Sequence, residues 1–169
     1  AVGVRRRPGR CPIIVSMTRT AVCTLFEAHY HHGVAALVNS LVAAGYRGTV
    51  WVGHRGPLPA WLTRRAGFDR AAGRLQVTPQ VVLQAVALDP PHSLNYEKPA
   101  FMRALLQVHE PTADAVVYLD PDLVVKCAWT EIEAWFADGA VALVEDVDGA
   151  LPSDHPRRER WCRFFAAHG

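Results

Sequence analysis

The sequence lacks the marks of several protein classes. No apolar run approaches the roughly 18 residues that a membrane-spanning helix requires, so we expect no membrane span. The four cysteines are widely separated and form no Cys-x-x-Cys pair, which argues against a zinc ribbon or a redox motif. Because there is also no export signal, scattered thiols favour a reducing compartment, and we expect a cytoplasmic protein.

An excess of charge of one sign is absent as well. The 18 basic and 16 acidic residues are mixed along the chain and give a net charge of only +2, so we expect no nucleic-acid partner. The arginines at positions 5–7 are followed by Pro8, Gly9 and Pro12, which interrupt any signal peptide. We therefore expect residues 1–20 to form a mobile basic segment and residues 21–169 to form one domain.

Two phosphate-binding fingerprints are missing too. The first expected strand is not followed by Gly-x-Gly-x-x-Gly, and the chain contains no Gly-x-x-x-x-Gly-Lys. Neither a dinucleotide-binding loop nor a Walker loop is therefore predicted. Any phosphate-bearing ligand has to be held by other groups.

What the sequence does contain is an alternation of apolar runs with amphipathic segments. Its 169 residues, half of them hydrophobic, are enough to bury the core of one domain. The alternation predicts an α/β fold with a mainly parallel, Rossmann-like sheet that helices cover on both faces. Strands are expected at residues 21–26, 49–52, 81–88, 115–119, 123–125 and 141–144, and helices at residues 34–42, 60–74, 98–106, 130–139 and after Pro156.

Several of these helices have marked ends. Gly45 stands where a C-cap glycine belongs, and Pro99 suits a first helical turn. Thr130 and Glu133 match a capping box, which predicts a helix start at this point. The inward stripe of the helix at 98–106 is expected to consist of Phe101, Met102, Leu105 and Leu106.

The most informative stretch is residues 115–125, where an apolar run leads directly into Asp120, Pro121 and Asp122. Residues two apart in an extended segment face the same side, so the two carboxylates can converge on one point at the end of a strand. They repel each other unless a cation lies between them, and a hard divalent ion prefers such oxygen ligands. The alternative is an acidic corner between two strands, because Asp and Pro are also turn formers.

The motif has a context that resembles a known family. The segment Leu-Asn-Tyr-Glu-Lys-Pro-Ala-Phe-Met-Arg-Ala-Leu-Leu at 94–106 precedes the Asp-x-Asp strand, and the Thr130 helix follows it. Together they resemble the nucleotide-sugar-binding half of type-A glycosyltransferases, and most of all the glycogenin and galactosyltransferase-like group. Residues 39–46 and 51–56 also look like the first β-α-β unit of such enzymes.

The resemblance implies a donor site for a nucleoside diphosphate sugar. Asp120 and Asp122 would hold Mn²⁺ or Mg²⁺, with Asp120 also near the substrate, and Lys98 would add positive charge beside the phosphates or the sugar. The base would lie near the end of the first strand. The residues implied there are Thr24, Phe26 and Tyr30, with Arg55 as a further candidate for the same pocket.

The resemblance also implies what is missing. Enzymes of this group continue into an acceptor-binding half, whereas this sequence stops at Gly169. We therefore expect a truncated, donor-binding part that transfers sugar poorly to an unknown acceptor. The surface that the absent half would cover is expected to favour self-association.

Two other functions remain open. Haloacid-dehalogenase-type phosphatases also place Asp-x-Asp after an apolar strand, but there the motif belongs to the first strand and is followed by threonine, whereas Leu123 follows here. A non-catalytic nucleotide-sugar binder is the third possibility. The cluster of His29, His31 and His32 is interpreted as a polar helix start near the nucleotide rather than as a metal site.

Overall fold

The computed structural model describes residues 19–135 and 156–168. The chain divides into two units, residues 1–135 and 136–169. Helix α5 (Pro156–His168) belongs to the second unit and confirms the helix expected after Pro156. Residues 1–18 of the predicted mobile segment and the predicted strand at 141–144 lie outside the described residues, whereas Thr20 already belongs to the first strand.

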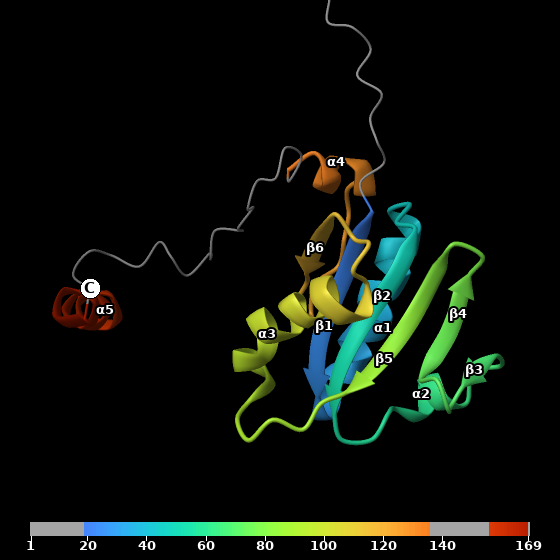
Figure 1. Cartoon of the computed structure of the whole chain (residues 1–169), viewed down its shortest axis with the longest axis horizontal. Coiled ribbons are helices and arrows are strands. Elements are labelled where there is room, and N and C mark those ends of the chain that lie inside the picture. The colour runs from blue at the N-terminus through green and yellow to red at the C-terminus, as the bar shows by residue number, and fades with distance from the viewer. Residues whose placement is uncertain (1–18, 136–155, 169) are drawn as a thin grey trace, which may run out of the picture. The chain divides into compact units, whose positions relative to one another are not determined.

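The first unit is built on a six-stranded sheet with the order β3-β4-β5-β2-β1-β6 (Figure 1). Strands β5, β2, β1 and β6 are parallel, and β3 and β4 are antiparallel additions at one edge. This arrangement confirms the α/β class. The strands are β1 (Thr20–Glu27), β2 (Gly48–Arg55), β3 (Phe68–Asp69), β4 (Arg74–Thr78), β5 (Val81–Ala87) and β6 (Ala115–Tyr118).

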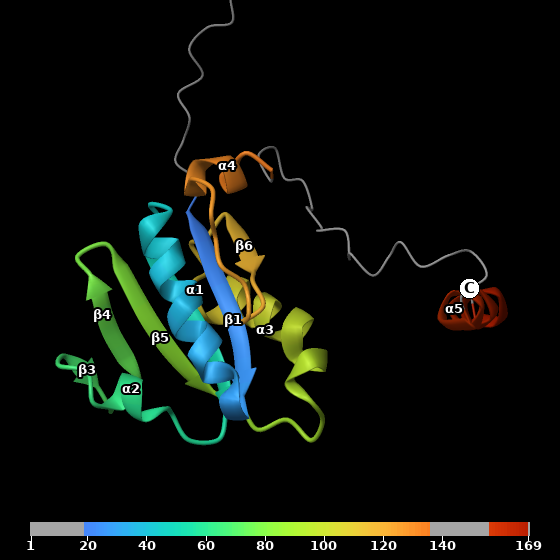
Figure 2. The same cartoon turned by 180° about the vertical axis from the view of Figure 1, so that it is seen from behind.

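Helices cover both faces of the sheet. Helix α1 (His31–Ala43) crosses the near face in Figure 2, and α3 (Lys98–Ala104) crosses the opposite face, which is nearer in Figure 1. The α3 face buries Cys23 and Leu25 of β1 against Phe101 and Leu105. Short helical turns complete the unit: η1 (Ala28–Tyr30), α2 (Ala60–Thr63), η2 (Leu94–Glu97), the π-helical turn η3 (Leu105–His109) and α4 (Trp129–Glu133).

Helix α1 forms where the apolar spacing predicted it. Val34, Leu37, Val38 and Leu41 are buried at intervals of three and four residues, which places them on one face. Gly45 has a φ of +86°, and the amide of Tyr46 donates to Leu41 O at 3.0 Å, which closes the helix as a Schellman motif. Glycine adopts this left-handed conformation without strain, so the sequence prediction of the helix end is confirmed.

The short helix expected in residues 60–74 forms only over their first turn, and the rest of the segment is not helical. Helix α2 ends at Thr63, and β3 and β4 then form an antiparallel hairpin in which Phe68 pairs with Leu75. Gly67 and Gly73 both have positive φ angles, which permit the tight turns before and inside this hairpin. β3 has only two residues and β4 begins only at Arg74, so residues 60–74 contain too short an alternation to predict a strand.

Three predictions near the Asp-x-Asp motif also need correction. Residues 123–125 form no strand, and Leu123 and Val124 are exposed, because the chain turns at Asp120 and the Leu123 amide donates to Asp120 O at 3.1 Å. Helix α4 starts at Trp129 after an Ala128 N-cap, so the predicted capping box does not form, and its predicted end at Gly139 lies outside the described residues. Leu106 is exposed rather than inward-facing.

No helix within residues 19–135 or 156–168 has the length and apolar character that crossing a membrane requires.

Candidate functional site

The candidate site is a cavity at the carboxyl ends of β1 and β6. The chain runs from β1 through β2 to β5 on one side and then returns to place β6 on the other side of β1, so the strand order reverses at this point. Open α/β sheets bind ligands at such a switch point. The cavity has a volume of about 280 Å³ and is lined by Leu25, Phe26, Glu27, Tyr30, Leu94, Asn95, Tyr118, Asp120, Pro121 and Asp122.

The Asp120–Asp122 loop is held in place from two sides. The Leu119 amide donates to Cys23 O at 2.9 Å, which continues the pairing of β6 with β1 up to the motif. On the other side the buried Pro121 lies against the first turn of α1. A β-carbon on Gly33 would lie only 2.1 Å from Pro121 O, so this close approach requires glycine.

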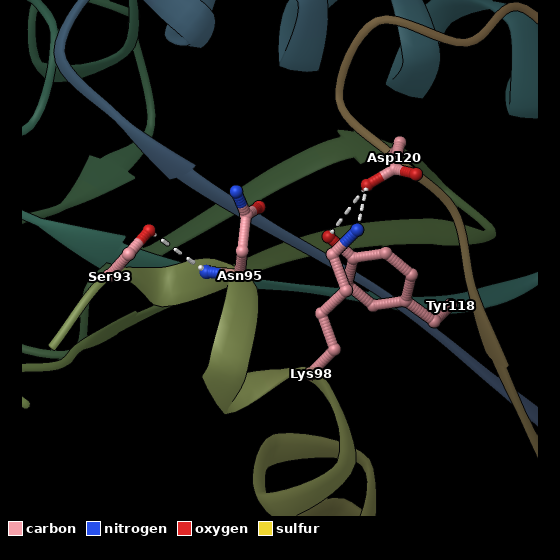
Figure 3. A network of polar contacts seen from close by, with 5 residues as sticks. All are labelled: Ser93, Asn95, Lys98, Tyr118 and Asp120. Carbon is pink, nitrogen blue, oxygen red and sulfur yellow. Dashed lines mark hydrogen bonds and ion pairs between the residues drawn. The ribbon is translucent and has the colours of Figure 1, made fainter. Parts of the chain in front are cut away.

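Asp120 is the centre of a polar network (Figure 3). Lys98 Nζ lies 2.6 Å from Asp120 Oδ1, and the Tyr118 hydroxyl donates to the same oxygen at 3.1 Å. The Lys98 ammonium also lies 4.8 Å from the centre of the Tyr118 ring. Burial raises the pKa of Tyr118 above its usual range, and the neighbouring Asp120 charge adds to this, so Tyr118 stays protonated and remains a donor.

The two carboxylates differ in their surroundings. Asp120 contributes one oxygen to the Lys98 pair, with its side chain 47% exposed, while Asp122 is exposed at the cavity wall. No group of three or more His, Cys, Asp or Glu side chains able to hold a metal occurs in the described part of the chain. The residues fit a hard divalent ion in kind, since Asp120 and Asp122 would supply two oxygen ligands and leave the other positions to phosphate and water, as is common for Mg²⁺.

Only some of the residues implied for the base pocket lie in the wall of this cavity. Phe26 and Tyr30 line the cavity, and Tyr30 is 48% exposed. Thr24 is completely buried and does not line the cavity, and its hydroxyl has no hydrogen-bond partner within the described structure. Only the aromatic part of the predicted pocket is therefore brought to the carboxylates.

Arg55 lies beside the cavity rather than in its wall. Its guanidinium is 3.5 Å from Glu27, which does line the cavity, and it also donates to the carbonyl of His92. His92 in turn forms a 2.6 Å contact with Glu97. Arg55 therefore connects the ends of β1 and β2 to the loop that leads into η2.

The three histidines stand at the start of α1, as the sequence predicted, and lie near the cavity. His29 stacks on Tyr30, and His31 Nδ1 accepts a hydrogen bond from Trp61 Nε1 at 3.1 Å. Desolvation and the neighbouring His32 and His29 lower the pKa of His31, which favours the neutral ring that this acceptor role requires. Within the described residues these side chains are not part of a metal-binding group.

Sequence reasoning missed several residues that line the cavity or support its wall. Tyr118 carried a readable signal, because it lies two positions before Asp120 in an extended segment and therefore faces the same side. Asn95, with its backbone amide bonded to Ser93 Oγ, lines the cavity through the fold of η2 (Figure 3). Gly33 and Ala28 gave no local signal, yet Ala28 has a φ of +51°, an uncommon conformation for a residue other than glycine.

Strained backbone of this kind clusters at functional sites. Ala28 lies between Glu27 and Tyr30, which line the cavity, so it supports the choice of this cavity independently of the charges there.

The comparison with known proteins adds no evidence on function. No protein-family model matches the chain, and no curated protein matches it.

Proposed function

We propose that this domain binds a nucleoside diphosphate sugar, through a divalent ion held by Asp120 and Asp122, as the donor for glycosyl transfer. The observation that carries the proposal is the place of these two carboxylates, which line one cavity at the switch point of the sheet together with Phe26 and Tyr30. The resemblance of residues 94–106 and of the Asp-x-Asp motif to type-A glycosyltransferases points to the same ligand.

The cavity walls match the parts of such a ligand. Tyr30, which is 48% exposed, offers aromatic surface to a flat base, and Phe26 contributes a mostly buried part of the wall. Asp120 and Asp122 line the same cavity and would hold a cation-bound diphosphate. A volume of about 280 Å³ is just below the usual range for small-molecule sites, so part of the ligand would extend into solvent. Mn²⁺ or Mg²⁺, when bound, would supply Lewis-acid stabilisation of the diphosphate leaving group.

The test is a calorimetric titration of the 169-residue chain with nucleoside diphosphates, with and without Mn²⁺. We expect Asp122→Asn to weaken the Mn²⁺-dependent affinity by about tenfold or more, because one of two charged ligands is lost. The fold should be retained, since Asp122 is exposed and its removal relieves repulsion. Asp89→Asn is the matched control, because Asp89 is also exposed at the carboxyl end of a strand but does not line the cavity.

Equal Mn²⁺-dependent affinity in Asp122→Asn and the parent would contradict the proposal. Two further measurements separate the alternatives. Hydrolysis of a general phosphatase substrate that is lost in Asp120→Asn would favour the phosphatase, with Asp120 as nucleophile. Donor binding without transfer to water or to any offered acceptor would favour the non-catalytic binder.

A further inference from the structure

One carboxylate oxygen of Asp120, Oδ1, is already paired with a cationic side chain. Lys98 Nζ lies 2.6 Å from Asp120 Oδ1, and the Tyr118 hydroxyl donates to the same atom. We propose that Lys98 is an internal counter-ion that competes with the divalent cation for Asp120 and is released toward the diphosphate when that cation binds; this rests on the proposed function.

Competition follows from electrostatics. An ammonium at 2.6 Å satisfies a carboxylate oxygen strongly, because both partners are charged. A divalent ion on the same carboxylate would repel that ammonium at a separation of a few ångström, where the repulsion persists although solvent screens part of it. The two cations therefore cannot both use Asp120 at full strength, and part of the binding energy of the metal is spent on displacing Lys98.

Lys98 is able to move, and Tyr118 keeps the carboxylate in position when it does. The Lys98 side chain is 31% exposed and has a flexible four-carbon stem, so its ammonium can leave Asp120 without unfolding α3. The Tyr118 hydroxyl would still donate to Asp120 Oδ1 and hold its orientation. The displaced ammonium stays beside Asp120 at the cavity wall, within reach of a diphosphate held in the same cavity.

This exchange couples the two ligands. Metal alone binds weakly, because Lys98 loses Asp120 and gains nothing, whereas metal with diphosphate binds well, because Lys98 gains a phosphate. Removing the ammonium should therefore strengthen the binding of metal alone and weaken the binding of diphosphate. A lysine that merely contacts phosphate, or merely stabilises the fold, would not produce two effects of opposite sign.

The experiment compares the parent with Lys98→Met, Lys98→Arg and Lys126→Met in the full chain. Titration with MnCl₂ alone should give an affinity about tenfold higher in Lys98→Met, the size expected when one charged hydrogen bond no longer competes. At saturating MnCl₂ the affinity of the same variant for UDP and GDP should fall about tenfold. Lys98→Arg keeps the charge and should resemble the parent in the MnCl₂ titration.

Lys126→Met is the control, because Lys126 is exposed and the ion pair with Asp120 is made by Lys98; the variant should change neither affinity. Unchanged or weaker Mn²⁺ binding in Lys98→Met would contradict the proposal that Lys98 competes for Asp120. The absence of Mn²⁺ binding in every variant would contradict it as well. Stronger Mn²⁺ binding in Lys98→Met with no diphosphate binding in the parent would support the competition with Asp120 and reject both the diphosphate release and the proposed function. Diphosphate binding in the parent with unchanged Mn²⁺ affinity in Lys98→Met would reject the counter-ion and its release, and would leave the proposed function supported.

Discussion

The two ends of the parallel strands are built in opposite ways. At the amino ends of β1 and β2, Tyr46 is buried, and its hydroxyl lies 3.0 Å from Thr20 O and 2.8 Å from Thr49 O. Trp129 of α4 packs edge-on against its ring, with centroids 4.8 Å apart, and its amide donates to Ala44 O. This end is apolar, closed and hydrogen-bonded.

The carboxyl ends of the same strands are open and carry unfavourable features. Ala28 has a positive φ, Asp122 and Tyr30 are exposed, and Asp120 is paired with Lys98. The eight residues of β1 separate the two ends, and the buried core lies between them. The difference predicts that the amino end supplies more of the stability than the carboxyl end, where the candidate site lies.

The largest expected change in stability comes from a substitution at the amino end of the strands. Tyr46→Ala removes a fully buried aromatic ring and should lower the free energy of unfolding by about 3–5 kcal/mol, as measured by urea denaturation. Tyr46→Phe keeps the ring and should lose only about 1–3 kcal/mol, for the carbonyl groups left without their donor. A loss below about 1 kcal/mol in Tyr46→Ala would show that the amino end does not supply the stability assigned to it.

The next prediction compares a glycine-to-alanine substitution near the start of α1 with the same substitution just after its end. Gly33→Ala places a methyl group on Pro121 O, so the Asp120–Asp122 loop must shift, and the affinity for Mn²⁺ with UDP should fall about tenfold or more. Gly45→Ala has open space around it but a φ of +86°, so it should cost about 1–2 kcal/mol of stability and leave the affinity unchanged. Equal affinities in Gly33→Ala and the parent would mean that the loop position is unimportant for binding.

A smaller effect tests the strain at the carboxyl end. Ala28→Gly removes the penalty of a left-handed conformation, and after the entropy cost of glycine the domain should gain about 0.5–1 kcal/mol. The control is Ala43→Gly at the exposed end of α1, where the same substitution should destabilise by up to about 1 kcal/mol. Thermal unfolding measures both changes, and a loss of stability in Ala28→Gly would refute stored strain at this corner.

The smallest effect concerns pH. The pKa of His31 is lower in the folded state than its ordinary value of 6.5. As the pH falls below about 6.5, His31 is therefore protonated more readily in the unfolded chain than in the folded one. The contribution of neutral His31 is therefore complete above about pH 6.5 and is lost as the pH falls through its folded pKa. His31→Asn, which keeps an acceptor for Trp61, should flatten the dependence of unfolding free energy on pH between about 5 and 7.

The amino end provides the contrast for this measurement. Burial raises the pKa of Tyr46 above its usual range, so this residue does not change its charge between about pH 5 and 7. An unchanged slope in His31→Asn would assign the pH dependence to other groups.

Local sequence determined much of the fold. The spacing of Val34, Leu37, Val38 and Leu41 was enough to predict α1, and Gly45 was enough to predict its end, because both depend on interactions within a few residues. The apolar strands and the position of Asp120 and Asp122 at the end of one of them were predictable for the same reason. Where local preference was weak, at 60–74 and 123–125, the prediction was wrong.

Only the tertiary structure decided how the site is assembled. The return of β6 to the far side of β1 brings Asp120 to Phe26 and Tyr30, and no local pattern specifies which side of β1 is taken. The pairing of Lys98 with Asp120 and the contact of Gly33 with Pro121 join residues 22 and 88 positions apart. Such contacts depend on the packing of whole elements, and this is why Gly33, Asn95 and Ala28 became visible as site residues only in the folded chain.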